Sequence, residues 1–278
     1  MKLQYLGTAA AEGWPAIFCE CAACKKAEAL GGKNIRMRSG AFVNDRLLID
    51  VPPDLYAEKL RFHLDLSAVR HIVITHSHSD HFDRETLGMF MEPFAHLTNR
   101  GPLHLYGSAF TEKVWHEYGA LALLKGSRVN EEVTFRVIKP FETFTAEGIT
   151  FTALPAAHGC PESLIYILEQ GGAKFLYGND TGLWSEDVWA FLQQSGTPFT
   201  HVSLDGTLGD SSSAYTGHMT FSGNAYVRER MLSTGIAAKD TRFITTHFSH
   251  NIALTHGEME ALMNPKGFTV AYDGMIVE

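Results

Sequence analysis

The hydrophobic positions of this chain fall into two kinds of segment: short apolar runs, and longer stretches in which apolar residues recur every three or four positions. The short runs are rich in Val, Ile, Leu and Phe and are bounded by Gly, Pro, Asn or Asp, which is typical of β-strands. Strands are predicted at 3–6, 41–43, 46–49, 70–74, 103–106, 134–138, 150–154, 164–168, 174–177, 201–204, 242–245 and 268–271. Asn44 and Asp45 predict a tight hairpin turn between the second and third.

Helical periodicity appears in six stretches between these strands. Helices are predicted at 53–62, 84–97, 109–124, 186–194, 222–234 and 256–263. The Met and aromatic stripes in them are interpreted as core. Strands in two groups with helices between them indicate two packed sheets with helices outside, although periodicity alone establishes only α/β or α+β. With neither a repeat nor a linker composition in view, we predict one domain, 1–278.

Composition and charge narrow the class of function. Hydrophobic residues make up 45% of the 278, enough for a sizeable core, and the net charge is −8 without a Lys/Arg-rich run. That balance argues against a nucleic-acid partner, yet a small anionic substrate stays compatible if bound metals supply local positive charge. Residues 1–7 lack the apolar core of a signal peptide, and no run reaches the roughly 18 apolar residues of a membrane span. We therefore expect a cytoplasmic protein without a membrane partner; a homodimer is left open.

The most informative motif lies directly after the predicted strand 70–74. His76, His78, Asp80 and His81 place three imidazoles and one carboxylate within six positions. These side chains suit borderline divalent metals such as zinc, manganese and iron. In an extended stretch residues i and i+2 point the same way, so His76 and His78 can face one ion. Asp80 and His81 follow the turn and can serve a second ion close by.

The motif His-x-His-x-Asp-His after a buried strand resembles the signature of the metallo-β-lactamase-fold hydrolases, which have an αββα sandwich. Family members add a His, an Asp and a His at later strand ends, and His158, Asp180 and His247 follow predicted strands in that order. The resemblance implies one metal held by His76, His78 and His158 and another held by Asp80, His81 and His247. Asp180 would bridge them, and a metal-bridging hydroxide would act as the nucleophile.

The resemblance also assigns roles around the metals. Asp50 ends the predicted strand 46–49, where family members use an acidic residue to support the ligand loop by hydrogen bonding. Asp80 could orient the attacking hydroxide besides binding a metal. His218 lies in a segment similar to the substrate-side loop of phosphodiesterase members, where it could protonate a leaving group. The alternative for His218 is a helix-start or core residue. Asp205 could orient a ligand or His218, or simply cap its strand.

Three of the four cysteines, Cys19, Cys21 and Cys24, lie within six positions. Such spacing in a reducing compartment indicates a metal site rather than a disulfide. Together with His250 it resembles the PhnP-type cyclic-phosphate phosphodiesterase branch of the family, in which these residues would hold a structural zinc. Residues 6–15 and 271–275 resemble that branch too. A redox-active or incidental cluster is the alternative, and the lone Cys160 is interpreted as packing.

These features predict a dinuclear metal-dependent hydrolase, specifically a phosphodiesterase on a small phosphate ester such as a cyclic ribosyl phosphate. The metals would be zinc or manganese, with iron as a further option. Alternatives on the same fold are a lactonase or other ester hydrolase, and a pyrroloquinoline-quinone biosynthesis B-like protein. A tRNA nuclease is disfavoured by the charge and by the lack of a long protruding arm. The alternative from another class is a metal-dependent binding or sensor protein.

Overall fold

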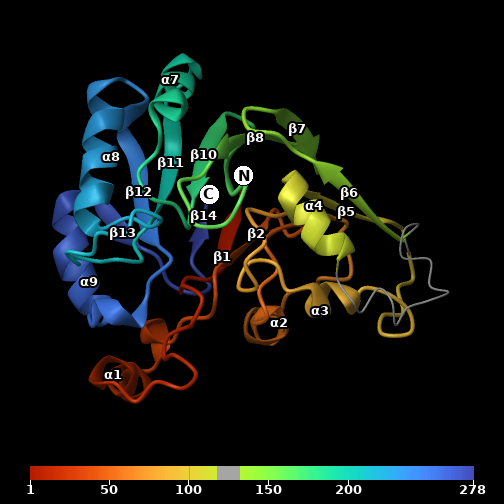
Figure 1. Ribbon diagram of the computed structural model, residues 1–278. Helices are drawn as coiled ribbons and strands as arrows, with labels where there is room; N and C mark the ends of the chain where they lie inside the picture. Colours follow the sequence, from red (N-terminus) through yellow and green to blue (C-terminus); the bar gives the residue numbers. More distant parts are fainter. Residues whose placement is uncertain (100, 118–131) are drawn as a thin grey trace.

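Two seven-stranded mixed sheets pack face to face, with helices on both outer faces (Figure 1). The computed structural model describes residues 1–99, 101–117 and 132–278. The first sheet runs in the order β14 (Ile276–Val277), β1 (Leu3–Gly7), β2 (Gly40–Val43), β3 (Leu47–Ile49), β4 (His71–Val73), β5 (Leu103–Gly107) and β6 (Val133–Val137). The second runs in the order β13 (Phe268–Val270), β12 (Ala237–Thr246), β11 (Phe199–Asp205), β10 (Ala173–Gly178), β9 (Leu164–Gln170), β8 (Ile149–Pro155) and β7 (Thr143–Ala146).

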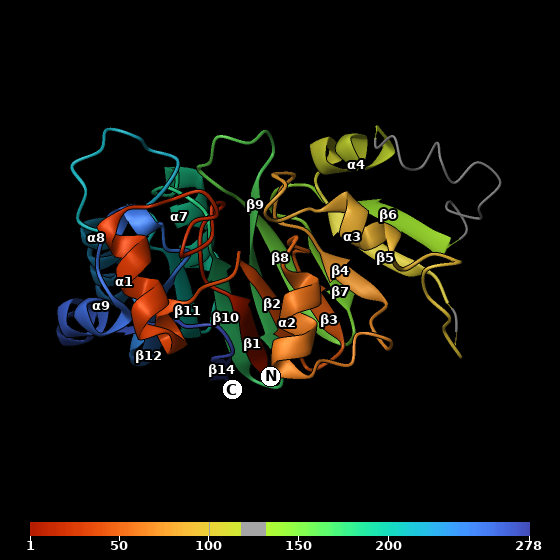
Figure 2. The ribbon, with the colours of Figure 1, turned by 90° about the horizontal axis from the view of Figure 1, so that it is seen from below.

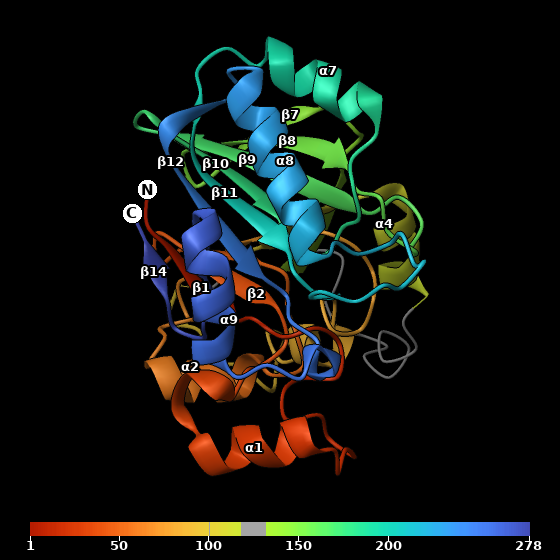
Figure 3. The same cartoon turned by 90° about the vertical axis from the view of Figure 1, so that its left-hand side faces the viewer.

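Apart from α1, the helices divide between the two outer faces, as Figures 1, 2 and 3 show from three sides. The α-helices are α1 (Ala22–Leu30), α2 (Leu55–Phe62), α3 (Arg84–Gly88), α4 (Ala109–His116), α7 (Glu186–Gln194), α8 (Phe221–Ser233) and α9 (His256–Met263). Short 3-10 turns lie at η1 (Gly32–Asn34), η2 (His250–Ile252) and η3 (Asn264–Lys266). The helices α7, α8 and α9 cover the second sheet, and α2, α3 and α4 cover the first.

Strand alternation builds three hydrophobic layers. In β10, Phe175 and Tyr177 point between the sheets, while Leu176 points outward to the layer containing Val188 and Trp189 of α7. Successive strand side chains face opposite sides, so a strand covered on both faces needs an unbroken apolar run. This explains why the buried strands are continuous apolar segments in the sequence.

Strand direction brings the functional segments to one edge. The strands β3, β4, β5 and β6 pair in parallel, and so do β10, β11, β12 and β13. Parallel strands end at the same edge of a sheet, and ligands are commonly bound outside those carboxyl ends. The strand β8 is antiparallel to β9, which is antiparallel to β10, so β8 also ends at this edge.

The predicted fold class, two packed mixed sheets with helices outside, is confirmed. The helix predicted at 84–97 is too long, since α3 ends at Gly88, a poor helix former, and Pro93 lacks the N–H that a continuing helix needs. The helix predicted at 109–124 begins as expected and α4 ends at His116. The part of this prediction at 118–124 lies outside the described residues.

Three elements were not predicted. The helix α1 carries only Cys24 and Ala27 as buried residues, so it has no apolar stripe; the Cys21 thiol caps its first turn by accepting the Cys24 N–H. The edge strand β7 buries only Phe144 and Ala146, and β14 spans two residues. Among the described residues no helix is long and apolar enough to span a membrane.

A buried carboxyl group lies under the first sheet. Glu58 of α2 is 0% exposed, and among the described residues neither of its carboxyl oxygens has a hydrogen-bond partner. Burial, and then the nearby negative charges of Asp273 and Asp54, raise the pKa of Glu58 well above its usual value. Because the folded state holds a proton that the unfolded chain releases, rising pH destabilises the fold above the ordinary pKa of a glutamate.

We therefore expect Glu58→Gln to remove part of the pH dependence of stability. While only the folded state holds this proton, wild-type stability should fall by about 1.4 kcal/mol per pH unit more than that of the variant. Urea unfolding at pH 5, 6, 7 and 8 measures the two slopes. The exposed Glu229 of α8 supplies the control, Glu229→Gln. Parallel curves for wild type and Glu58→Gln would contradict a proton held at Glu58.

Candidate functional site

Strand ends and the loops after them bring the predicted metal ligands together at the common edge of the two sheets. His76 and His78 follow β4, and His158 follows β8. Asp180 follows β10, and His247 follows β12. The motif turns as expected after His78, whose carbonyl accepts the backbone N–H groups of His81 and Phe82.

The first group of ligand atoms contains the three imidazoles assigned to one metal. Nδ1 of His78 lies 3.1 Å from Nε2 of His76 and 3.1 Å from Nε2 of His158. Oδ2 of Asp180 is 3.3 Å from Nε2 of His76. The four side chains therefore offer one ligand atom each within 4.8 Å of one another.

The second group shares Asp180. Nε2 of His81 lies 3.3 Å from each of Nε2 of His247, Oδ2 of Asp80 and Oδ2 of Asp180. Oδ2 of Asp180 is 3.6 Å from Nε2 of His247. One oxygen of Asp180 thus lies between both groups, as a bridging ligand would.

The remaining ring nitrogens are committed to hydrogen bonds. Nδ1–H of His81 donates to Oδ2 of Asp50 at 2.7 Å. Nδ1–H of His158 donates to the Gly217 carbonyl at 3.0 Å. These contacts fix the tautomer so that Nε2 of each ring presents a lone pair to the cluster.

The ring of His247 is fixed in a similar way. The Thr207 hydroxyl donates to the His247 carbonyl and accepts from its Nδ1–H, both at 2.7 Å. A single threonine therefore sets both the backbone and the ring of this residue, and its Nε2 is left free for the cluster.

This donor set fits divalent cations. Lone pairs facing each other at 3.1–3.3 Å cannot all be satisfied by hydrogen bonds. Ligands about 2.0 Å from a tetrahedral zinc lie about 3.3 Å apart, which matches these separations. Oδ1 of Asp180 is buried without a hydrogen-bond partner among the described residues. Two ions could therefore be held by His76, His78, His158, Asp80, His81 and His247, with Asp180 between them.

Apart from His81, whose carboxylate neighbours favour its protonated form, the electrostatics of the cluster favour its ligand forms. Burial lowers the pKa of His76, His78 and His247 and keeps them neutral, the form that binds metal. Burial alone would raise the pKa of Asp180, but the surrounding imidazoles, His247 first, outweigh it and hold that pKa well below the usual range. Burial would lower the pKa of His81, yet the carboxylates of Asp80 and Asp50 raise it.

Three of these positions have left-handed backbone. Asp50 has φ of 65°, Asp180 of 64° and His247 of 59°, and each lies within two residues of a strand end. Non-glycine residues rarely adopt this region, and they are found there most often as Asp, Asn or His. The turn out of the strand redirects each side chain toward the cluster.

His218, predicted as catalytic, lies beside Asp180. Its Nδ1–H donates to Oδ2 of Asp205 at 2.9 Å, while Oδ1 of Asp180 is 3.0 Å from the same nitrogen. Burial would lower the pKa of His218, but the carboxylates of Asp180 and Asp205, which flank its Nδ1–H, raise it to about 10. Asp205 is fully buried and also accepts the backbone N–H groups of Thr207 and Met219. The sequence left two roles open for Asp205, orientation of a neighbouring side chain or a strand cap. This geometry favours orientation of His218.

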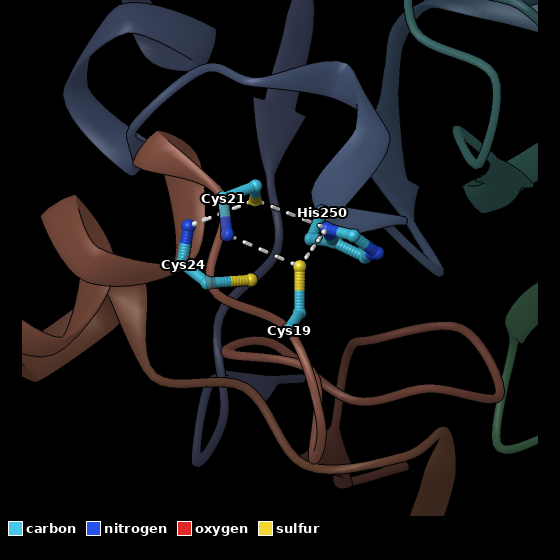
Figure 4. A group of neighbouring side chains, drawn as sticks. All are labelled: Cys19, Cys21, Cys24 and His250. Atoms are coloured by element: carbon cyan, nitrogen blue, oxygen red, sulfur yellow. Dashed lines mark hydrogen bonds between the residues drawn. The ribbon is translucent and has the colours of Figure 1, made fainter.

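The cysteine cluster forms a separate group with His250 (Figure 4). Nδ1 of His250 lies 3.7 Å from the sulfur of Cys19 and 3.6 Å from that of Cys21. Sulfur and nitrogen ligands of a tetrahedral zinc lie about 3.5 Å apart, so the four residues could hold one. A hydrogen bond from the Cys24 backbone, then His250 and Cys19, lower the pKa of the Cys21 thiol to about 6. Burial raises the pKa of the Cys24 thiol to about 11.

Several contributing residues carry no sequence signal of their own. Thr207 anchors His247 from a loop after β11, and only the fold brings it there. Tyr215 stacks at a tilt against His218, with ring centroids 5.4 Å apart. Glu12 accepts a hydrogen bond from Ser249, two residues after His247. Cys160 is buried and lies 3.3 Å from the Ser77 hydroxyl, in keeping with a packing role.

The comparison with known families agrees with this site. The profile described as the Beta-lactamase superfamily domain matches residues 45–248. The chain belongs to this family. The predicted metallo-β-lactamase fold is thereby confirmed. No curated protein sequence matches the chain.

Solved structures share the fold over the whole chain. A diphosphatase from the PhnP family is 24% identical, with a TM-score of 0.74, covering 100% of this chain and 97% of the other. Zinc-bound PqqB from Methylobacterium extorquens is 19% identical, with a TM-score of 0.77, covering 100% of both chains. The short form of human tRNase Z is 18% identical, with a TM-score of 0.67, covering 100% and 99%. At these identities the likeness concerns the fold alone.

If Asp180 bridges two ions and the cysteine cluster holds a third, metal content should respond separately to changes at each. We expect about three ions per chain in carefully prepared protein. Asp180→Asn should lose both ions of the shared cluster, because a neutral amide no longer offsets their mutual repulsion. Cys21→Ser should lose only one. Elemental analysis measures this, with exposed Asp187→Asn as control. Three retained ions in Asp180→Asn would contradict the bridge.

Proposed function

We propose that this protein is a dinuclear metal-dependent phosphodiesterase that hydrolyses a small anionic phosphate ester, with a cyclic ribosyl phosphate as the leading candidate. The observation that carries the proposal is the pair of ligand groups that share Asp180, with His218 beside them. When bound, two such ions lower the pKa of water and act as Lewis acids toward phosphoryl oxygens.

The chain's own residues position the reactants. A cavity of about 490 Å³ opens onto the cluster and is lined by His78, Asp80, Asp180, His218 and His247. Asp80 can accept a hydrogen bond from the attacking water and so orient it. The water releases one proton to solvent, and as its oxygen bonds to phosphorus the ester P–O bond breaks.

His218 is the candidate for protonating the leaving oxygen. It is partly exposed and lines the cavity, and Asp205 fixes its ring. A cation beside Asp180 would reduce the charge that raises the pKa of His218 and bring it toward neutral pH, where an imidazolium is an effective acid. A proton moves from His218 to the leaving alkoxide, which becomes a hydroxyl group of the product.

The cysteine cluster supports the site indirectly. We assign it a structural zinc held by Cys19, Cys21, Cys24 and His250. His250 is three residues after His247, so this ion would fasten the loop that carries a catalytic-site ligand to the N-terminal loop. A structural ion of this kind contributes to folding and takes no part in the reaction.

The direct test is turnover of bis(p-nitrophenyl) phosphate after chelation and reloading with Mn²⁺ or Zn²⁺. We expect activity that appears on reloading and is lost in Asp180→Asn. A parallel panel of lactones separates a lactonase from a phosphodiesterase. Inactivity on every ester and lactone, in protein with full metal content, would favour a binding or sensor protein or a PqqB-like role over hydrolysis.

The role of His218 is tested by His218→Ala. If it protonates the leaving group, kcat should fall roughly 100-fold at unchanged metal content, and the loss should shrink for good leaving groups such as p-nitrophenolate. If it grips the phosphate instead, KM should rise for all esters alike. His116→Ala, at an exposed position of α4, is the control. Unchanged kinetics on both kinds of ester would remove His218 from the mechanism.

A further inference from the structure

A second cavity, of about 680 Å³, lies against the cluster on the side of α8. It shares three lining residues, His158, Tyr215 and His218, with the cavity over the proposed metals. A substrate phosphorus near His218 would therefore present one of its ester groups to this second cavity. This volume is large enough for a ring-sized group.

The second cavity carries no fixed charge that could pair with an ionised substrate. Apart from the two shared histidines, the described residues that line it are small, hydroxyl-bearing or apolar, and include Leu183, Leu208 and Met219. No lysine or arginine is among them. The cavity over the cluster has only acidic fixed charges, Glu12, Asp80 and Asp180. Positive charge would thus come only from bound cations and from a protonated His218, both at the place of one phosphate group.

The start of α8 offers little to an anion, because two of its first three N–H groups are already paired. Thr220 caps this helix and lines the second cavity. The first N–H groups of a helix attract anions only when they are free. Here the Phe221 N–H donates to the Gly209 carbonyl at 2.7 Å, and the Gly223 N–H donates to the Thr220 hydroxyl at 3.0 Å.

The wall between the two cavities is held in place by close packing. A Cβ added to Gly217 would lie 2.5 Å from the Tyr215 hydroxyl, and one added to Gly182 would lie 1.8 Å from the Thr216 carbonyl oxygen. The Gly182 N–H donates to the Ala157 carbonyl at 2.8 Å. Residues 215–217 are therefore pressed against neighbouring backbone, and the second cavity is largely formed before a ligand arrives.

From these observations we infer that the second cavity is a subsite for an uncharged organic group, the leaving group of the ester, and that Leu183 helps to exclude charged ones. This inference rests on the proposed function. The subsite narrows the substrate class to phosphodiesters with a single ionised phosphate and a neutral leaving alcohol. Esters whose leaving alcohol carries a further phosphate or carboxylate are disfavoured, because burying an unpaired anion costs binding energy.

Binding and turnover test this inference separately. Methyl benzylphosphonate and its 3-carboxybenzyl analogue have a P–C bond in place of the leaving ester bond, so neither can be cleaved there. Calorimetry with metal-loaded protein should show that the compound with the uncharged benzyl group binds about tenfold tighter or better. Turnover of methyl phenyl phosphate and methyl 3-carboxyphenyl phosphate, which differ by one charge but little in phenol acidity, should show the same preference in kcat/KM.

The decisive variant is Leu183→Arg. Leu183 is 50% exposed, so arginine can be accommodated, and its guanidinium would bring a positive charge to the cavity. We expect the preference for the benzyl over the carboxybenzyl compound to shrink about tenfold or reverse. Leu60→Arg, at a 55% exposed position of α2 outside both cavities, should leave it unchanged.

The possible outcomes distinguish failure of the subsite from failure of the proposed phosphodiesterase activity. Equal binding of the two phosphonates, binding of neither, or an equal response to both arginine variants would overturn the subsite. A binding preference that responds to Leu183→Arg, in protein that cleaves no ester, would support the subsite and overturn the proposed phosphodiesterase.

Discussion

The carboxylate of Asp180 is the element around which the rest of the site is arranged. It is 3% exposed, and ring nitrogens of five histidines lie 3.0–3.6 Å from its oxygens. An isolated buried carboxylate would cost many kcal/mol, so it must be surrounded by groups that favour its charge. The five histidines come from four separate segments of the chain. Only an architecture in which many strands end at one edge can deliver them to one point.

That requirement makes the supporting hydrogen bonds as important as the ligands. Neutral imidazole can point either a donor or a lone pair at Asp180 and its neighbours. Asp50, Thr207 and the Gly217 carbonyl each accept one Nδ1–H. The Nε2 atom of each of these rings therefore directs a lone pair toward the cluster. His218 differs because two carboxylates, those of Asp180 and Asp205, flank its Nδ1–H and favour the protonated ring. The hydrogen bonds to Nδ1–H therefore distinguish the histidines suited to bind cations from His218, which is suited to carry a proton.

Much of this could be predicted from the sequence, because the ligands lie at strand ends and the strands are strongly apolar. The short motif at 76–81 and the later strand ends at His158, Asp180 and His247 are visible as local patterns. The roles of Thr207 and Tyr215 could not be predicted, since they depend on how the segment between β11 and α8 folds over the site. The end of α3 was missed because its apolar periodicity continues past Gly88, although Gly88 and Pro93 disfavour the helix. The helix α1 was missed because its stability comes from a thiol cap and the cysteine cluster rather than from a hydrophobic stripe.

The left-handed backbone at Asp50, Asp180 and His247 bears on how such a site can change over time. Alanine at these positions would combine loss of a side-chain function with roughly 1–2 kcal/mol of backbone strain. Asparagine and glycine avoid most of that strain. Few residues can therefore replace these three without strain. Main-chain geometry limits the substitutions independently of the chemistry of the side chain. Diversification of this scaffold should accumulate in the segment 210–216, between Thr207 and His218, where the walls of the cavities can vary without disturbing the strand exits.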